Sequence, residues 1–313
     1  MDSNDSLIDY ITTVRDYLFS GNDRVPKKRL PTKEVNINHF NNTDKTELNI
    51  TWLGHSSLMI NINGYKILTD PVFEKSISLL GPTRYNGKTP LDTNLLNNID
   101  VVIISHNHYD HLNKFSIQLL NKKTKKFIVP LYIGNQISNW GVPQEKIVEL
   151  DWWEQYRFDK KLLIVATPAQ HFSGRGLFDR NKTKWISCVI RTDLHRLFFS
   201  GDSGYFDGFK KIGERYGPFD ITLIECGTYN SLWSKFHMFP EQSVQAHIDL
   251  RGKLLQPIHC GTFNMALHPW YEPFTRLTSF AKDRKVKVST PIVGETVIYD
   301  KNNNFYNWWE SYM

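Results

Sequence analysis

The chain has 313 residues, of which 40% are hydrophobic and 22% are charged, and its formal net charge is +6. This composition supports a large buried core and excludes an intrinsically disordered protein. No apolar run approaches the roughly 20 residues that span a bilayer, and residues 1–5 are polar, without the apolar core of a signal peptide. We therefore expect a cytoplasmic protein or one that contacts a membrane peripherally.

Much of the positive charge lies in two short runs, at residues 26–29 and 122–126. Runs of this kind are usually solvated turns or helix ends, and the functional alternative is attraction to anionic lipid head groups or another phosphate-bearing partner. Basic residues do not alternate regularly with aromatic residues, so nucleic acid is not expected as a partner. The three cysteines, Cys188, Cys226 and Cys260, have no paired spacing and are expected to be buried free thiols.

Residues 1–45 are predicted to form an amino-terminal arm. Apolar residues follow helical spacing between Leu7 and Leu18, which predicts one short amphipathic helix that packs on its own domain or, alternatively, on a membrane. No linker of disordered composition interrupts residues 46–313, and we expect these residues to form one domain.

The core is predicted to open with strands that begin at residue 48 and continue at 57–62 and 65–69. Asn63-Gly64 is a strong hairpin signal between the second and third strands. Asp70 follows them, either as a turn residue that caps backbone N–H groups or as a buried carboxylate that orients a metal-bound imidazole. His55 is expected to support the site or the fold, and the loop at 81–91 is expected to lie near the site.

Four potential metal ligands lie within six residues, directly after an apolar run at 101–104 that is typical of a buried strand. Side chains alternate in an extended segment, so His106, His108 and Asp110 can project to one side, while His111 can turn toward a second centre. Imidazole and carboxylate together suit zinc, and iron or manganese less exclusively. Single loop histidines are often solvated, but this density of ligands predicts a metal site.

Three more polar residues stand at or just beyond the ends of later predicted strands. His171 follows the strand at 162–167, Asp202 follows 196–200, and His259 follows 254–258. Open sheets place their chemistry at the carboxyl ends of strands, so we expect these residues to join the first cluster.

The second half of the chain resembles the first in its pattern of strands. Further strands are predicted at 127–131, 185–192, 221–225 and 288–299, and helices near 206–215, 240–250 and 272–284. Pro240 fits the first turn of its helix. Two β-rich halves with helices outside them indicate an α/β protein in which two packed sheets lie between helical layers.

The order His-x-His-x-Asp-His, followed by an isolated His, an Asp and a His, is the pattern of the metallo-β-lactamase superfamily. A narrower resemblance, to the N-acylphosphatidylethanolamine-hydrolysing phospholipase D family of zinc hydrolases, covers about residues 48–285. Its motifs are at 52–55 (Trp-Leu-Gly-His), 69–71 (Thr-Asp-Pro), 104–112, 149–154 (Glu-Leu-Asp-Trp-Trp-Glu), 201–205 (Gly-Asp-Ser-Gly-Tyr), 219–220 and 258–263 (Ile-His-Cys-Gly-Thr-Phe). Cys260 stands where that family often has Trp, and the loops at 173–184 and 229–239 are only loosely similar.

The resemblance implies the metallo-β-lactamase fold, which is a four-layer αββα sandwich of two mixed β-sheets flanked by helices, over residues 46–313. It also implies two Zn²⁺ ions. One zinc would be held by His106, His108 and His171, and the other by Asp110, His111 and His259, with Asp202 bridging the pair.

The same resemblance implies two catalytic residues and a substrate wall. Asp110 would hold the attacking water or accept its proton, and His237 would donate a hydrogen bond to the phosphate. The candidates for the wall that contacts the acyl chain or head group are Trp152, Trp153, Tyr229 and Phe263, and core packing is the alternative for each of them.

The expected function is hydrolysis of a glycerophospholipid by a dinuclear zinc phosphodiesterase of the phospholipase D type, most directly of N-acylphosphatidylethanolamine to phosphatidic acid and N-acylethanolamine. Because a fold does not determine its substrate, the alternative is another hydrolase of this fold, such as a sugar-phosphate lactonase or a phosphodiesterase for soluble substrates. A non-catalytic metal-binding protein is disfavoured because every ligand position is present. The oligomeric state is not predicted.

Overall fold

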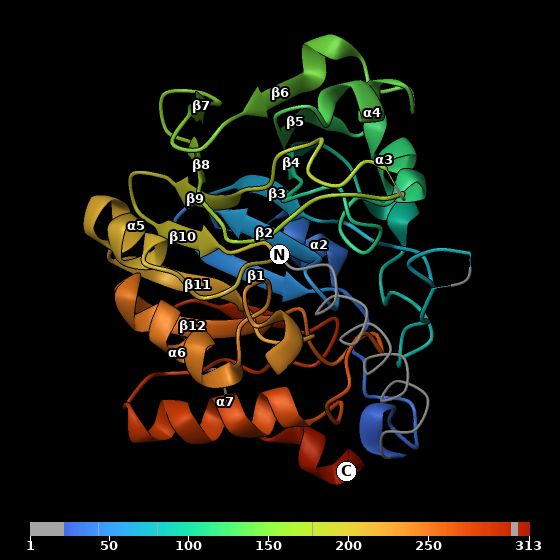
Figure 1. Ribbon diagram of the computed structural model, residues 1–313. Coiled ribbons are helices and arrows are strands. Elements are labelled where there is room, and N and C mark those ends of the chain that lie inside the picture. The colour runs from blue at the N-terminus through green and yellow to red at the C-terminus, as the bar shows by residue number, and fades with distance from the viewer. Residues whose placement is uncertain (1–21, 43, 80, 177, 302–305) are drawn as a thin grey trace.

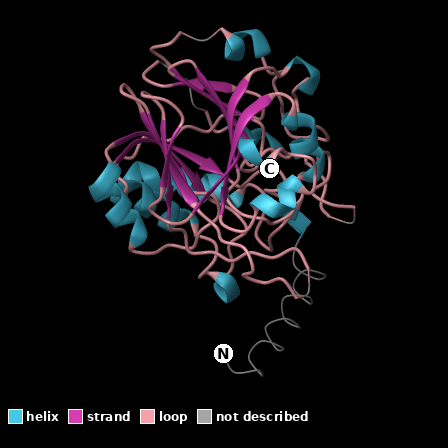
Figure 2. Ribbon diagram, turned by 90° about the horizontal axis from the view of Figure 1, so that it is seen from above, coloured by secondary structure: helices cyan, strands magenta, loops and turns pink. Residues whose placement is uncertain are grey.

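The computed structural model describes residues 22–42, 44–79, 81–176, 178–301 and 306–313 (Figure 1). The amphipathic helix expected between Leu7 and Leu18 lies outside these residues. Within the described ranges the strands form two mixed sheets that pack face to face, and helices cover their outer faces (Figure 2). The predicted α/β class and the αββα layering are confirmed.

The first sheet has the strand order β13-β1-β2-β3-β4-β5-β6 in the described part of the chain. Its strands are β1 (Leu48–Trp52), β2 (Leu58–Ile62), β3 (Tyr65–Thr69), β4 (Ile99–Ile103), β5 (Thr124–Pro130), β6 (Ile147–Leu150) and β13 (Thr296–Ile298). The predicted hairpin joins β2 to β3, where Asn63 and Gly64 have φ values of 53° and 87°. Both residues are left-handed, as a two-residue type I′ turn requires, and Ile62 therefore pairs with Tyr65.

The second sheet has the order β12-β11-β10-β9-β8-β7 in the same described ranges. Its strands are β7 (Gln155–Arg157), β8 (Leu163–Thr167), β9 (Ser187–Arg191), β10 (Arg196–Phe199), β11 (Phe219–Glu225) and β12 (Gly252–Ile258). β7 to β10 are antiparallel, and β10 to β12 are parallel. Parallel strands need a helical crossover, and α5 and α6 provide one after β10 and one after β11.

Helices form the two outer layers. The first sheet is covered by α2 (Ile37–Asn41), α3 (Lys114–Asn121) and α4 (Gly134–Ser138), and the second by α5 (Gly208–Tyr216), α6 (Pro240–Asp249) and α7 (Glu272–Asp283). The remaining helical turns are the 3₁₀ segments η1 (Asn22–Arg24), η2 (Thr93–Leu95), η3 (Gln144–Lys146), η4 (Ser231–Trp233) and η5 (Trp308–Tyr312). Pro240 is the first residue of α6, as predicted.

Alternation along each strand divides the core into layers. Ile67, Val101 and Ile103 face the second sheet, whereas Leu68 and Val102 face the helices of the first sheet. Apolar residues on both faces explain why these strands read as continuous hydrophobic runs in the sequence. Cys188, Cys226 and Cys260 are buried free thiols, as expected.

One local prediction is wrong. The strand expected at 288–299 is regular only over β13, because Pro291 and Gly294, which has a φ of 91°, interrupt the pairing. The adjacent residues Trp152 and Trp153 lie outside the strands. They form a turn after β6, in which Trp153 has a φ of 72°.

Candidate metal centre

The carboxyl ends of strands from both sheets meet at one edge of the sandwich, and the predicted ligands lie there. The loop that holds His106 to His111 follows β4, His171 follows β8, Asp202 follows β10, and His259 follows β12. The structure therefore brings together all seven residues that the sequence predicted as metal ligands. This convergence follows from the parallel direction of the strands that carry them.

Three imidazoles form the first group of donors. Nε2 of His106 lies 2.8 Å from Nδ1 of His108, and Nε2 of His171 lies 3.3 Å from the same atom. Burial lowers the pKa of His108 to about 4 and lowers the pKa of His106 and of His171 well below the usual value. Neutral imidazoles offer lone pairs, so these three nitrogens could hold a metal ion.

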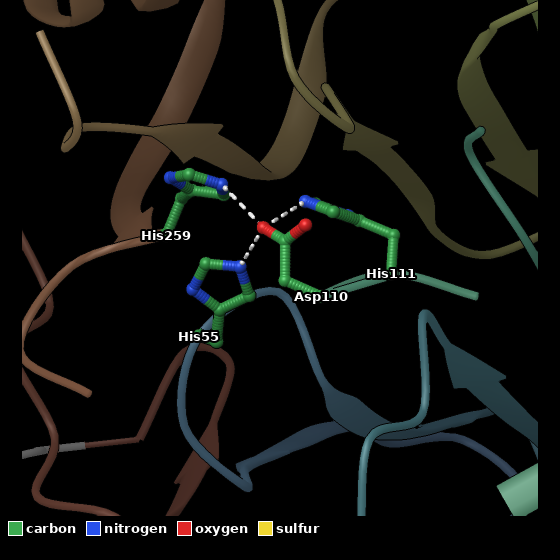
Figure 3. Close-up of side chains that lie close together, drawn as sticks. All are labelled: His55, Asp110, His111 and His259. Carbon is green, nitrogen blue, oxygen red and sulfur yellow. Dashed lines mark hydrogen bonds and ion pairs between the residues drawn. The ribbon is translucent and has the colours of Figure 1, made fainter. Parts of the chain in front are cut away.

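The second group combines imidazole with carboxylate (Figure 3). Oδ2 of Asp110 lies 3.2 Å from Nε2 of His111 and 3.5 Å from Nε2 of His259. Oδ2 of Asp202 lies 3.2 Å and 3.1 Å from the same two nitrogens. It also lies 3.8 Å from His106 and 3.7 Å from His171, both at Nε2. Asp202 therefore stands between the two groups, in the position of a shared ligand.

The two carboxylates give the second group a strong preference for positive charge. Burial disfavours the charged form of His259, but the nearby carboxylates of Asp202 and Asp110 raise its pKa to about 10. The pKa of His111 is likewise well above its usual value, because Asp202, Asp110 and Asp70 outweigh the effect of burial. A position that favours positive charge in this way could hold a divalent cation.

Several buried atoms of this cluster are left without partners. Among the described residues, Nε2 of His111, Nε2 of His259 and Oδ1 of Asp202 make no hydrogen bond. Buried polar atoms are nearly always paired, so unpaired atoms that point at one another fit a bound ion. Nitrogen and oxygen donors in this combination suit zinc, and iron or manganese less specifically.

Each candidate ligand imidazole has a second ring nitrogen, and in four of the five rings this nitrogen has a partner outside the cluster. Nδ1 of His106 is 2.9 Å from Ser105 Oγ, Nδ1 of His111 is 2.7 Å from Asp70 Oδ2, Nδ1 of His171 is 3.1 Å from the Phe236 carbonyl, and Nδ1 of His259 is 3.3 Å from Thr228 Oγ1. Such contacts set ring orientation and tautomer. Two roles were predicted for Asp70, and its contact with His111 fits the second one, a buried carboxylate that orients an imidazole.

His55 supports the cluster from behind. Its Nε2 lies 2.9 Å from Oδ2 of Asp110 (Figure 3), and burial lowers the pKa of His55 to about 3. His55 is therefore neutral and donates its Nε2–H to the carboxylate. Its ring also meets Phe263 edge to face, with 5.3 Å between centroids.

Sequence reasoning missed Glu225, the last residue of β11. Its side chain is fully buried, with Oε2 3.0 Å from Nδ1 of His237 and Oε1 accepting the Met238 N–H at 2.6 Å. The His237 ring lies 5.2 Å from the His171 ring and 5.3 Å from the His259 ring. A polar residue at the end of an apolar strand was the available signal, because the same signal identified Asp202 and His259.

Sequence reasoning also missed Arg175. Nη1 of this residue donates to the carbonyls of Asn107 and Leu112, at 2.7 Å and 2.8 Å, and its guanidinium stacks on Tyr109 at 3.7 Å. The two carbonyls bracket the segment that carries His108 to His111. Arg175 thereby holds the metal-binding loop in shape, and no local pattern in the sequence signals this contact.

The four candidates for a substrate wall lie in different surroundings. Phe263 borders a cavity of about 20 Å³ that His259 also lines. Tyr229 is 3% exposed, donates to Glu272 at 2.8 Å and stacks on His268. Trp152 is 36% exposed and donates to the Trp185 carbonyl, and Trp153 packs beside Arg215. Phe263 therefore lies beside His55 and His259, whereas Tyr229 is packed in the core.

Comparison with known proteins identifies the superfamily of this chain. The model of the β-lactamase superfamily domain matches residues 65–260. The structure aligns with that of Igni18, a metallo hydrolase from Ignicoccus hospitalis, with a TM-score of 0.60 and 24% identity over 82% of this chain and 100% of that chain. The protein is a metal-dependent hydrolase with the metallo-β-lactamase fold, as predicted.

Proteins related in sequence show which members of the superfamily this chain resembles. An uncharacterized protein of Mycobacterium tuberculosis is 41% identical over 85% of this chain and 73% of its own length. The N-acyl-phosphatidylethanolamine-hydrolyzing phospholipase D 1 of Caenorhabditis elegans is 32% identical over 86% of this chain and 79% of its own length. The chain therefore belongs to the β-lactamase superfamily, with phospholipase D proteins of this type among its relatives. No helix among the described residues is long and apolar enough to cross a membrane.

Proposed function

We propose that the protein is a dinuclear zinc phosphodiesterase of the phospholipase D type and that its substrate is N-acylphosphatidylethanolamine, which it hydrolyses to phosphatidic acid and N-acylethanolamine. The observation that carries the proposal is the convergence of seven imidazole and carboxylate side chains from four segments of the chain. The substrate is inferred from the similarity to the Caenorhabditis elegans enzyme. The hydrolase domain is assigned to residues 46–313.

The donors divide into two sets. His106, His108 and His171 would hold one zinc, and Asp110, His111 and His259 the other, with Asp202 shared between them. Two zinc ions held in this way would lower the pKa of the attacking water and neutralise charge on the phosphate oxygens. Iron or manganese is the alternative metal.

Asp110 has the central role among the residues of the chain itself. His55 donates to its Oδ2, so the carboxylate is held in one orientation and stays ionised. An ionised carboxylate in this place would orient the attacking water and accept its proton.

His237 would act on the phosphate or on the departing group. Its Nδ1–H donates to Glu225, and the carboxylate stabilises the protonated ring, which would donate from Nε2 toward the space beside His171 and His259. Phe263 is the wall candidate that lies against the cluster, and Trp152, Trp153 and Tyr229 are proposed with it as contacts for the lipid. A lipid substrate also implies peripheral contact with a membrane.

Product analysis by mass spectrometry tests the proposal. Purified, zinc-loaded protein is incubated with N-acylphosphatidylethanolamine in mixed micelles, beside an Asp110→Asn variant whose thermal unfolding and metal content are measured first. Phosphatidic acid and N-acylethanolamine are expected from the wild type, with at least a roughly hundredfold lower yield from the variant.

Other outcomes would change the assignment in defined ways. If the lipid is returned intact while bis(p-nitrophenyl) phosphate is cleaved, the enzyme acts on soluble phosphodiesters and the lipid assignment is wrong. If neither compound is cleaved, a lactone substrate is the next test. Full turnover by metal-replete Asp110→Asn protein would refute the role of Asp110.

A further inference from the structure

The two basic runs of the sequence have different surroundings in the fold. In the run at 122–126, Lys123 donates to the Thr93 carbonyl, Lys125 pairs with Asp100, and Lys126 donates to the Glu145 carbonyl, at 2.6–2.7 Å. These lysines therefore stabilise the fold at the end of α3 and in β5. The run at 26–29 has no such explanation.

Lys27, Lys28 and Arg29 are all exposed and follow η1, which lies at the lower right of Figure 1 in dark blue. In the described part of the chain, none of the three side chains makes a hydrogen bond or an ion pair. Three adjacent unpaired cations repel one another, and a bound anion would relieve this repulsion.

These three residues line a surface hollow of about 480 Å³ together with Thr83, Tyr85 and Asn264. No acidic residue lines this hollow within the described ranges. Arg84 also lines the hollow, is 3% exposed, and donates from its guanidinium to the carbonyls of Leu53, Val72 and Glu74. Backbone carbonyls carry no net charge, so these bonds do not neutralise the positive charge of Arg84.

The hollow is close to the candidate metal centre. Tyr85 and Asn264 line both the hollow and the small cavity beside His259. The Tyr85 hydroxyl donates to the Arg24 carbonyl at 2.9 Å, and its backbone N–H donates to the Thr262 carbonyl at 2.9 Å. These bonds join the basic segment to the loop that follows His259.

We propose that this hollow is a binding site for a phosphate group, separate from the metal centre. A phosphate presents several oxygens at once, which suits one guanidinium and two ammonium groups on neighbouring residues. The side chains of Thr83 and Asn264 add uncharged donors, since neither makes a hydrogen bond in the described structure. The phosphate belongs either to a lipid head group at a membrane surface or to a free ion, and the site does not depend on the reaction proposed above.

A charge-removal experiment with two arms tests this site. The test variant is Lys27→Gln/Lys28→Gln/Arg29→Gln, and the matched control is Lys210→Gln/Lys211→Gln/Lys282→Gln, which removes the same charge from exposed helical positions. The first arm is co-sedimentation of metal-loaded protein with phosphatidylcholine vesicles that contain phosphatidylglycerol, compared with pure phosphatidylcholine. The second arm is calorimetric titration with inorganic phosphate.

We expect the test variant to bind with at least roughly tenfold lower affinity in one of the two arms, and the control to change by less than about twofold. Loss in the vesicle arm alone identifies a lipid head group, and loss in the phosphate arm alone identifies a free ion. Binding by the wild type should also weaken as sodium chloride rises, because the cations are exposed.

Equal losses in the two variants, no loss in the test variant, or no binding by the wild type in either arm would each overturn the site. Cleavage of a soluble phosphodiester is measured in parallel and should be the same in wild type and test variant. This readout separates failure of the phosphate site from failure of the proposed activity, which would remove cleavage from all three proteins.

Discussion

Nδ1 of His111 lies 2.7 Å from Oδ2 of Asp70, and neither side chain is accessible to solvent. The same carboxylate accepts the Ser105 N–H at 2.7 Å and the Ser105 hydroxyl at 2.6 Å. Asp70 thus connects β3 to the loop after β4 and turns Nε2 of His111 toward Asp110 and Asp202. The orientation of one ligand depends on a carboxylate 41 residues earlier in the chain.

Replacing this carboxylate should weaken metal binding without removing a ligand. In Asp70→Asn, we expect metal affinity to fall by roughly 10- to 100-fold, because the amide does not hold His111 in one tautomer as the carboxylate does. Affinity is measured by competition with a chromophoric chelator. The control is Asp220→Asn, since Asp220 also accepts a backbone N–H but lies at the start of β11 beside Arg196 and Lys253. Equal affinity in Asp70→Asn and wild type would show that the contact is dispensable.

Glu225→Gln should slow catalysis while leaving the metal content unchanged. The amide still fills the buried space beside His237, but it does not stabilise a positive charge on that ring when a proton is transferred. We expect kcat to fall by roughly a hundredfold on a cleavable phosphodiester, with an altered pH–rate profile.

A double substitution tests whether Glu225 acts through His237. In a His237→Asn background, the change at Glu225 should lower kcat little further, because the two residues form one unit. Loss of metal from Glu225→Gln, or additive losses in the double variant, would contradict this role and indicate a structural one.

Arg175→Ala should destabilise the metal-binding loop. The variant loses two charged hydrogen bonds to the carbonyls of Asn107 and Leu112, each worth about 1.5–3 kcal/mol in typical cases and less here because the side chain is partly exposed. We expect a lower Tm and weaker metal binding, both followed by thermal unfolding with and without added zinc.

Arg180→Ala is the matched control for Arg175. Arg180 belongs to the same loop, but its guanidinium lies over the rings of Phe172 and Phe236, at 4.3 Å and 5.8 Å from their centroids. The control should keep the metal affinity of the wild type. If both variants lose metal affinity alike, the effect belongs to the loop as a whole and not to the bonds made by Arg175.

The pH dependence of stability should contain a contribution from His247 on α6. Burial lowers the pKa of His247 to about 4, and its Nδ1 lies 2.7 Å from the Thr222 hydroxyl. The unfolded chain, with a pKa near 6.5, binds a proton that the folded protein excludes. Stability should therefore be full above pH 6.5 and decrease as the pH falls toward 4.

His247→Gln should flatten this dependence, because glutamine does not titrate. The measurement is Tm at pH 4.5 to 8 for metal-free wild type and variant, so that release of metal does not contribute. Identical slopes in the two proteins would show that His247 is not the titrating group. The variant should have the lower Tm at pH 8, since the ring packs closely against Gly252 and Thr222.

The seven metal-ligand candidates could be named from the sequence because each follows an apolar run or belongs to one dense cluster. Glu225 ends β11 in the same way, and the signal that found Asp202 would have found it as well. The prediction of a strand at 288–299 was wrong for a local reason, because proline and glycine interrupt the pairing.

The sequence by itself determined the layers, most of the strand ends and the set of candidate ligands, because alternation and apolar runs are properties of neighbouring residues. Only the tertiary structure decided which side chains meet. Asp70 reaches His111, Arg175 reaches the carbonyls of the metal-binding loop, and Lys27 to Arg29 line one hollow with Asn264. These contacts join segments that are far apart in the chain, and their geometry is set by the packing of two sheets and their loops, which no short pattern encodes.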